Sequence, residues 1–153
     1  MTAPTKITPT KLIVKREILI AEIKASWNLI INNNVFPVEL MPLYNLEAIY
    51  EQIKKNEIEL IETKIKLQAA NFGVKDLKNI PKDSAFYSIF LLQQIKERAV
   101  KLAMIPTKKE ETEKIAFTRK FIDTEIAKLN AEKIALEAYL LKFNEMSEIN
   151  DAA

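Results

Sequence analysis

The chain has 153 residues, 48% of them hydrophobic and 29% charged, and its formal net charge is only +2. This composition predicts one soluble domain with a sizeable core and excludes a disordered chain. The sequence contains no cysteine, no histidine and a single glycine, which excludes disulfides and thiolate metal sites and disfavours phosphate-binding loops and tight hairpins.

The first nine residues contain two prolines and three threonines, and they predict an extended N-terminal arm. Ile7 is its apolar anchor if the arm docks on a neighbouring subunit, and the alternative is a disordered tail. No secretory signal is visible at this end. The longest uncharged stretches, 25–38 and 84–95, are shorter than the ~18 apolar residues that a membrane span needs.

A helix is predicted over residues 10–33, and the triplet Asn32 to Asn34 is expected to end it with a left-handed cap. The connector 35–43 contains two prolines and several apolar residues. We expect this connector to pack under the end of the helices.

A second helix is predicted over 45–71, with Asn45 as its N-cap. Its apolar residues form two seams, which indicates contacts with two neighbouring helices. Asn56 and Thr63 interrupt one seam. We expect Asn56 to face water, and a buried asparagine that fixes the helix register is the alternative. Gly73, the only glycine, is placed to end the helix.

A third helix is predicted over 83–104, with Asp83 as its cap. A fourth is predicted over 107–144, because Pro106 ends the preceding helix and Thr107 and Glu110 match a capping box. At ~1.5 Å per residue this helix would be roughly 57 Å long. Residues 147–153 are predicted to form a short acidic tail that frays.

The predicted fold class is therefore all-α: an elongated antiparallel bundle of about four helices, two of them long, with an extended N-terminal arm. The segments 45–71 and 107–144 are expected to pair like a coiled coil. The predicted domain organisation is the arm (1–9), a single helical-bundle domain (10–146) and the acidic tail (147–153).

Paired carboxylates are the residues that come closest to a catalytic or metal-binding pattern, but no histidine or glycine-bearing turn accompanies them. We interpret them as a solvated face and expect no enzyme activity, cofactor or metal. The pairs are Glu57 with Glu62, Glu110 with Glu113, and Glu132 with Glu137.

Two basic clusters are candidate phosphate contacts, and they support an alternative function as a small nucleic-acid-associated or regulatory protein. The near-balanced net charge and the lack of a DNA-binding motif disfavour that alternative. The clusters are Lys6, Lys11, Lys15 and Arg16 near the N-terminus, and Lys96, Arg98, Lys101, Lys108 and Lys109 around the corner between the third and fourth helices.

The length of the fourth helix suggests an association surface, because a 57 Å helix would outrun its neighbours while staying apolar near its end. Leu136, Leu140, Leu141 and Phe143 are the candidate protein interface, together with Ile7 of the arm. We expect a non-catalytic structural or assembly protein in a homo- or hetero-oligomer. The Lys, Ile and Asn bias indicates an A/T-rich genome, which fits a cytoplasmic protein or a phage virion component.

Overall fold

The computed structural model describes residues 8–71 and 85–151. This part of the chain forms four helices and a small two-stranded antiparallel sheet, which confirms the predicted all-α class. The elements in chain order are α1 (Pro9–Asn33), β1 (Val35–Pro37), α2 (Leu46–Asn71), α3 (Ala85–Ala103), β2 (Glu113–Ile115) and α4 (Arg119–Asp151).

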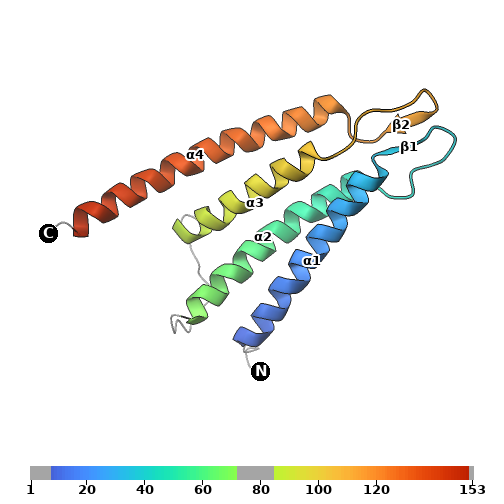
Figure 1. Cartoon of the computed structure of the whole chain (residues 1–153). Helices are drawn as coiled ribbons and strands as arrows, with labels where there is room; N and C mark the ends of the chain where they lie inside the picture. The colour runs from blue at the N-terminus through green and yellow to red at the C-terminus, as the bar shows by residue number, and fades with distance from the viewer. Residues whose placement is uncertain (1–7, 72–84, 152–153) are drawn as a thin grey trace, which may run out of the picture.

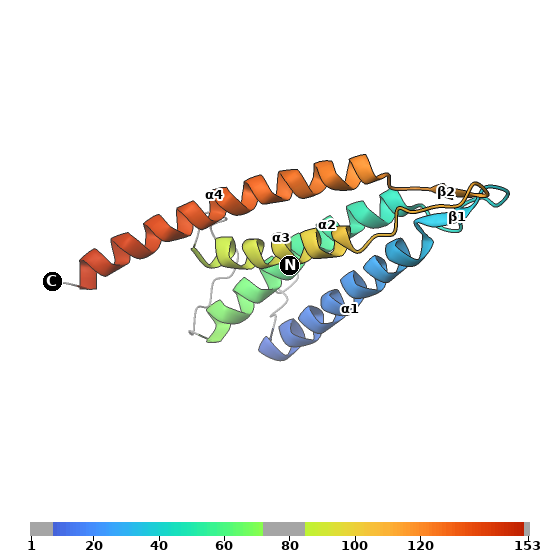
Figure 2. The same ribbon diagram turned by 45° about the horizontal axis from the view of Figure 1, so that its top comes forward.

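The helices form two antiparallel hairpins, α1 with α2 and α3 with α4, which meet through α2 and α3. Figure 1 shows them in the order α4, α3, α2, α1, spread like a fan. The connections within both hairpins lie together at one end, where β1 pairs with β2, and the helices diverge toward the other end (Figures 1 and 2). The result is an open layer of helices.

The predicted pairing of 45–71 with 107–144 needs correction, because α2 packs along α1 and α3. α2 meets α4 near the sheet end, where the rings of Tyr50 and Phe121 lie 6.1 Å apart and Lys54 approaches Glu125 at 3.7 Å. The interior position predicted for this helix from its two apolar seams is thus right, but its second neighbour is α3.

The predicted starts of the first two helices are confirmed to within one residue. The backbone N–H of Lys11 donates to the hydroxyl of Thr8, and Pro9 occupies the first turn, where its missing N–H costs nothing. The side chain of Asn45 accepts from the N–H of Ala48, as an N-cap does. The rest of the arm, including Ile7, and the caps expected at Gly73 and Asp83 lie outside the described residues.

The polar residues on the seam of α2 are buried, so the expectation that Asn56 faces water is wrong. Asn56 accepts a hydrogen bond from Gln52 at 3.0 Å, and the hydroxyl of Thr63 donates to the carbonyl of Glu59 at 2.7 Å. Both of these hydrogen bonds are made within α2 itself, and they reduce the cost of burying the two side chains.

The predicted start of the fourth helix at residue 107 is wrong. Residues 113–115 form β2, and α4 begins after Thr118, whose hydroxyl accepts from the N–H of Phe121. The extended path lets Ile115 pair with Val35 and buries Phe117 in the core, which the predicted helix would prevent. At ~1.5 Å per residue α4 is still about 50 Å long, against about 28 Å for α3, and it projects past α3 in Figure 2. Its backbone stays helical to Asp151, within the predicted tail.

An aromatic cluster fills the core near the sheet end. Tyr50 makes edge-to-face contacts with Trp27 and Phe117, each with ring centroids 5.9 Å apart. Phe117 stacks on Phe121 at 5.0 Å. Burial, followed by the nearby carboxylate of Glu125, raises the pKa of Tyr50, so its hydroxyl stays neutral. The cluster joins both hairpins.

Asn34 connects the two hairpins through its side chain. Its amide nitrogen donates to the carbonyls of Pro106 (2.8 Å) and Phe117 (3.1 Å), and its amide oxygen accepts from the N–H of Phe117 (2.6 Å). The residue is fully buried and has right-handed helical angles, φ −68° and ψ −33°, so the predicted left-handed cap is wrong at this position.

We expect the substitution Asn34→Ala to lower the free energy of unfolding by about 3 kcal/mol, because it leaves several buried backbone groups without partners. Asn32→Ala is the matched control, since Asn32 is exposed two residues earlier and its loss should cost less than about 0.5 kcal/mol. Urea unfolding followed by circular dichroism measures both. Equal effects of the two substitutions would contradict the role given to Asn34.

Candidate functional site

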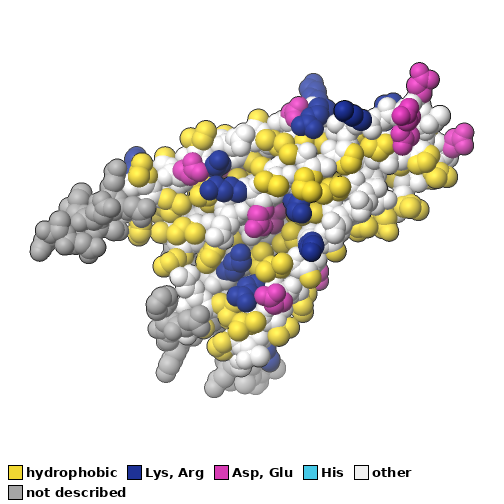
Figure 3. Space-filling model, viewed as in Figure 1, with side chains coloured by type: hydrophobic (Ala, Val, Ile, Leu, Met, Phe, Trp, Pro, Cys, Tyr) yellow, Lys and Arg dark blue, Asp and Glu magenta, His cyan; other side chains and the backbone are white. Residues whose placement is uncertain are grey.

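An open groove of about 390 Å³ lies between α1 and α3, with α2 as its floor. We call it the α1–α3 groove. In Figure 3 hydrophobic side chains are exposed across this face, with charged side chains beside them. The groove is lined by Ile20, Ile23, Lys24 and Trp27 of α1, by Glu57 and Leu60 of α2, and by Gln94, Lys96, Glu97, Arg98, Val100 and Lys101 of α3.

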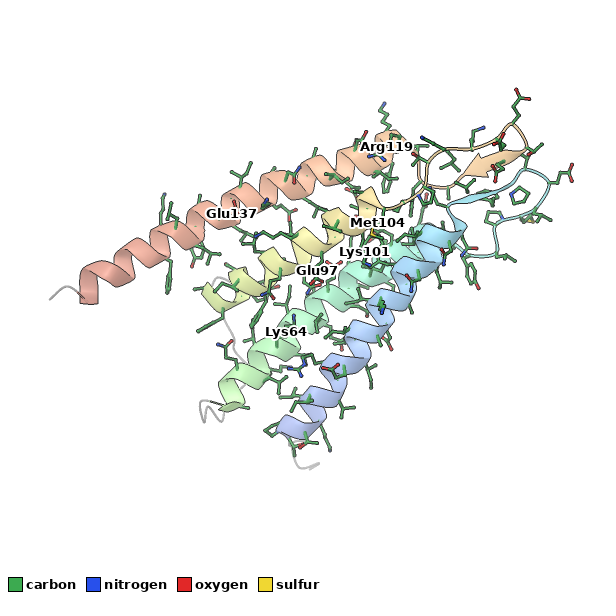
Figure 4. The ribbon with its side chains drawn as sticks, in the orientation of Figure 1. Lys64, Glu97, Lys101, Met104, Arg119 and Glu137 are labelled. Carbon is green, nitrogen blue, oxygen red and sulfur yellow. The ribbon has the colours of Figure 1, made fainter. Side chains whose placement is uncertain are left out.

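Helical spacing brings the apolar and basic residues of the groove together. Ile20, Lys24 and Trp27 are four and three residues apart, so they share one face of α1. Glu97 and Lys101 are four apart on α3, and Figure 4 shows them on the side toward α2. The groove therefore has an apolar base with charged side chains at its rim.

A buried ion pair joins α2 to α3 at the groove. Glu57 is only 2% exposed, and its two carboxylate oxygens accept from Nε of Arg98 at 3.2 and 3.1 Å. Burial raises the pKa of the Glu57 carboxyl, while hydrogen bonds and charge from Arg98 oppose the rise. The expectation that Glu57 belongs to a solvated acidic face is therefore wrong, and Arg98 is committed to a partner within the fold.

The charged groups of the groove suit non-covalent binding of a ligand through its surface and charge. The Glu57–Arg98 pair already satisfies its charges internally, and Lys96 approaches Glu137, which leaves Lys24, Lys101 and Glu97 at the rim to meet a ligand. Among the residues that the structure describes, no three acidic side chains gather where they could hold a metal ion. The arrangement therefore fits an apolar ligand that carries negative charge at its edge.

The structure does not bring the two predicted basic clusters together. Lys15 and Arg16 lie near the diverging end of α1, where they pair with Glu59 at 2.9 Å and with Glu17 at 3.2 Å. Lys11 is exposed beside them, and Lys6 lies outside the described residues. In the second cluster, Lys96 approaches Glu137 of α4 at 3.9 Å and lines the groove with Lys101 and Arg98, while Lys108 and Lys109 are exposed at the sheet end.

The predicted helix-end interface divides into two parts. Leu136 is half-buried and packs on the core, and Leu140 is half-buried as well. Leu141 and Phe143 are exposed. An association through this part of α4 stays a prediction for those two residues.

The two most exposed large apolar side chains of the described residues lie elsewhere, on the loop between β1 and α2. We call residues 38–45 the apolar tip. Met41 is 87% exposed and Leu43 85%, and Val38, Leu40 and Tyr44 are exposed too. The expectation that this connector packs under the helices is wrong for its distal part. In the sequence this segment is an apolar run interrupted by Pro42. Such a run forms too little regular structure to bury its own side chains.

No helix in the described ranges is long and apolar enough to cross a membrane. Comparison of the chain with protein-family models, curated proteins and solved structures found no match. The fold and the two surfaces, the α1–α3 groove and the apolar tip, are therefore the basis for a functional proposal.

We expect Arg98→Met to lower the free energy of unfolding by about 3–5 kcal/mol, because it leaves the Glu57 carboxylate buried without a partner. Combining it with Glu57→Leu should recover most of that loss, since an apolar pair needs no desolvation of charge. Arg119→Met is the control: Arg119 pairs with Asp123 in the open, and its loss should cost no more than about 1 kcal/mol. Chemical unfolding measures the stability of all three variants. The prediction is contradicted if the double variant is the least stable of them.

The pH dependence of stability should report the raised pKa of Glu57. A carboxyl with a raised pKa binds its proton more tightly in the folded chain, so its contribution to stability is complete below the ordinary value of 4.5 and is lost as pH rises through the folded pKa. We expect the stability advantage of the native chain over Glu57→Gln to shrink as the pH rises above the ordinary value of 4.5. A constant or growing advantage across a urea-unfolding series would contradict this assignment.

Proposed function

We propose that the protein is a non-catalytic assembly component that associates with other protein chains through its exposed apolar surfaces. The observation that carries the proposal is the apolar tip, where large side chains face water on a loop that the sheet holds in place. Contiguous apolar surface of this kind is typical of association sites, because covering it removes it from water.

The loop that bears the tip is anchored at its base. The N–H of Val38 donates to the carbonyl of Thr112 at 2.8 Å, which extends the pairing of β1 and β2. Leu40 then donates to the carbonyl of Pro37 at 3.1 Å, and Pro37 and Pro42 restrict the backbone further. A loop restrained in this way loses little conformational entropy on binding, which favours a role in docking.

Binding to nucleic acid receives less support. Lys15, Arg16 and Arg98 approach carboxylates of the same chain, which reduces the positive charge that they could offer to phosphates. The remaining candidates are spread along the molecule rather than gathered into one basic stripe.

The solution mass tests the proposal. At about 100 μM we expect a species heavier than the 17.6 kDa monomer, and we expect it to persist between about 50 mM and about 500 mM salt, because apolar contacts are not screened. Met41→Glu should shift the mass toward the monomer. Ile18→Glu is the matched control, since Ile18 is an exposed apolar residue of α1 outside the groove.

A monodisperse monomer at both salt concentrations would contradict self-association. An oligomer that dissociates as steeply with salt as phosphate contacts do would favour a charge-driven function instead. Light scattering coupled to size-exclusion chromatography distinguishes these outcomes.

A further inference from the structure

The apolar tip cannot cover the α1–α3 groove of its own chain. Val35 pairs with Ile115 and Pro37 with Glu113, and this pairing directs the loop beyond the end of the helices (Figures 1 and 2). The groove lies along the helices, among residues such as Trp27 and Leu60. Any contact between the two surfaces therefore has to join different copies of the chain.

The two surfaces are complementary in shape and polarity. The tip is convex and presents Leu40, Met41 and Leu43, unbranched or γ-branched side chains that can adapt to an irregular recess. The groove is concave, and its volume of about 390 Å³ falls within the ~300–1,000 Å³ of typical ligand pockets. Its apolar lining includes Ile20, which is 42% exposed, and Val100, which is 60% exposed.

The charges of the two surfaces are complementary as well. The only charged residue of the tip is Glu39. Glu57 and Arg98 are paired internally, and Lys96 approaches Glu137 of α4. The remaining charged residues of the groove are Lys24, Lys101 and Glu97, for a net charge of 2 − 1 = +1. Opposite charges at the rim of an apolar contact guide encounter and set orientation.

From these observations we infer that the apolar tip of one copy docks into the α1–α3 groove of a second copy, so that the chain assembles head to tail. The inference rests on the proposed function and names the partner and the contact. Each copy keeps a free tip or a free groove after one contact, so the contact is heterologous, and repeated contacts build a closed ring or an open filament.

A lipid surface is the competing occupant for an exposed apolar loop. It is disfavoured here because the exposed Lys108 and Lys109 are offset by Glu39, Glu110 and Glu111, so the sheet end has no net basic cluster that would attract anionic lipid. A protein groove bordered by lysines is the better match.

Disulfide trapping between two single-cysteine variants tests the contact, and the native chain has no cysteine that could interfere. We expect Met41→Cys mixed with Val100→Cys to give a mixed disulfide under mild oxidation. The yield should be at least about tenfold higher than for Met41→Cys mixed with Ile18→Cys, because a disulfide needs Cβ atoms held about 4 Å apart. Ile18 is a matched control because it is exposed on α1 like Val100 on α3 but does not line the groove.

Charge reversal tests the same contact without a covalent bond. Lys101→Glu should reduce the oligomeric mass, and Glu39→Lys should reduce it as well. A mixture of the two variants should recover association, since the reversed tip then meets the reversed groove. Recovery in the mixture separates a direct contact from a general loss of folding, which no mixing could repair.

Three results would overturn the inference. An oligomer without the mixed disulfide between tip and groove would leave the proposed function standing but place the contact elsewhere. A monomer without trapping would remove both the inference and the self-assembling form of the proposed function. Binding of the native chain to phosphatidylserine vesicles that Met41→Glu abolishes, with no trapping between copies, would assign the tip to a lipid surface.

Discussion

The amide of Asn34 is the interaction on which the arrangement of the two hairpins depends. It provides hydrogen-bond partners for three backbone groups of the connection between α3 and α4, and the carbonyl of the same residue accepts from the N–H of Ala116 at 2.9 Å. An amide can donate and accept at once, whereas a carboxylate can only accept and an alkyl group can do neither. Because these bonds are shielded from water, they fix the position of one hairpin end against the other.

The contact between α2 and α3 depends on a buried ion pair rather than on an amide. An ion pair as buried as Glu57 with Arg98 contributes little net stability, because desolvation of the charges offsets their attraction. It does penalise every register of the two helices in which either charge lacks its partner. Lys64, whose ammonium lies 5.7 Å from the ring centroid of Phe90, adds a second polar link between the same helices (Figure 4). Both contacts hold α3 against α2, which is the floor of the groove.

Local features of the sequence predicted those elements whose ends are set by local contacts. Thr8 and Asn45 act on N–H groups three residues away, so the starts of α1 and α2 could be predicted. The apparent capping box at Thr107 was misleading because the pairing of β2 with β1 and the burial of Phe117 outweigh it. Tertiary contacts override such local preferences when they bury more apolar surface.

The candidate site was less predictable than the fold. The partners of Asn34 lie 72 and 83 residues away, and those of Glu57 lie 41 residues away, so no local pattern reveals them. The exposure of Met41 and Leu43 could not be predicted either, since apolar residues on either side of a proline are equally compatible with a buried connector. The open layer of helices, which creates the groove, follows from the pairing of the hairpins rather than from the pattern of any one helix.

The division into two hairpins also shapes how the chain reaches its folded state. Contacts within each hairpin join neighbouring segments, so loop closure costs little entropy and each hairpin can form early. The sheet and the Asn34 amide join residues about eighty positions apart, and closing so long a loop is slower. The sequence separations of these contacts therefore favour helix pairing within each hairpin before the docking of one hairpin on the other.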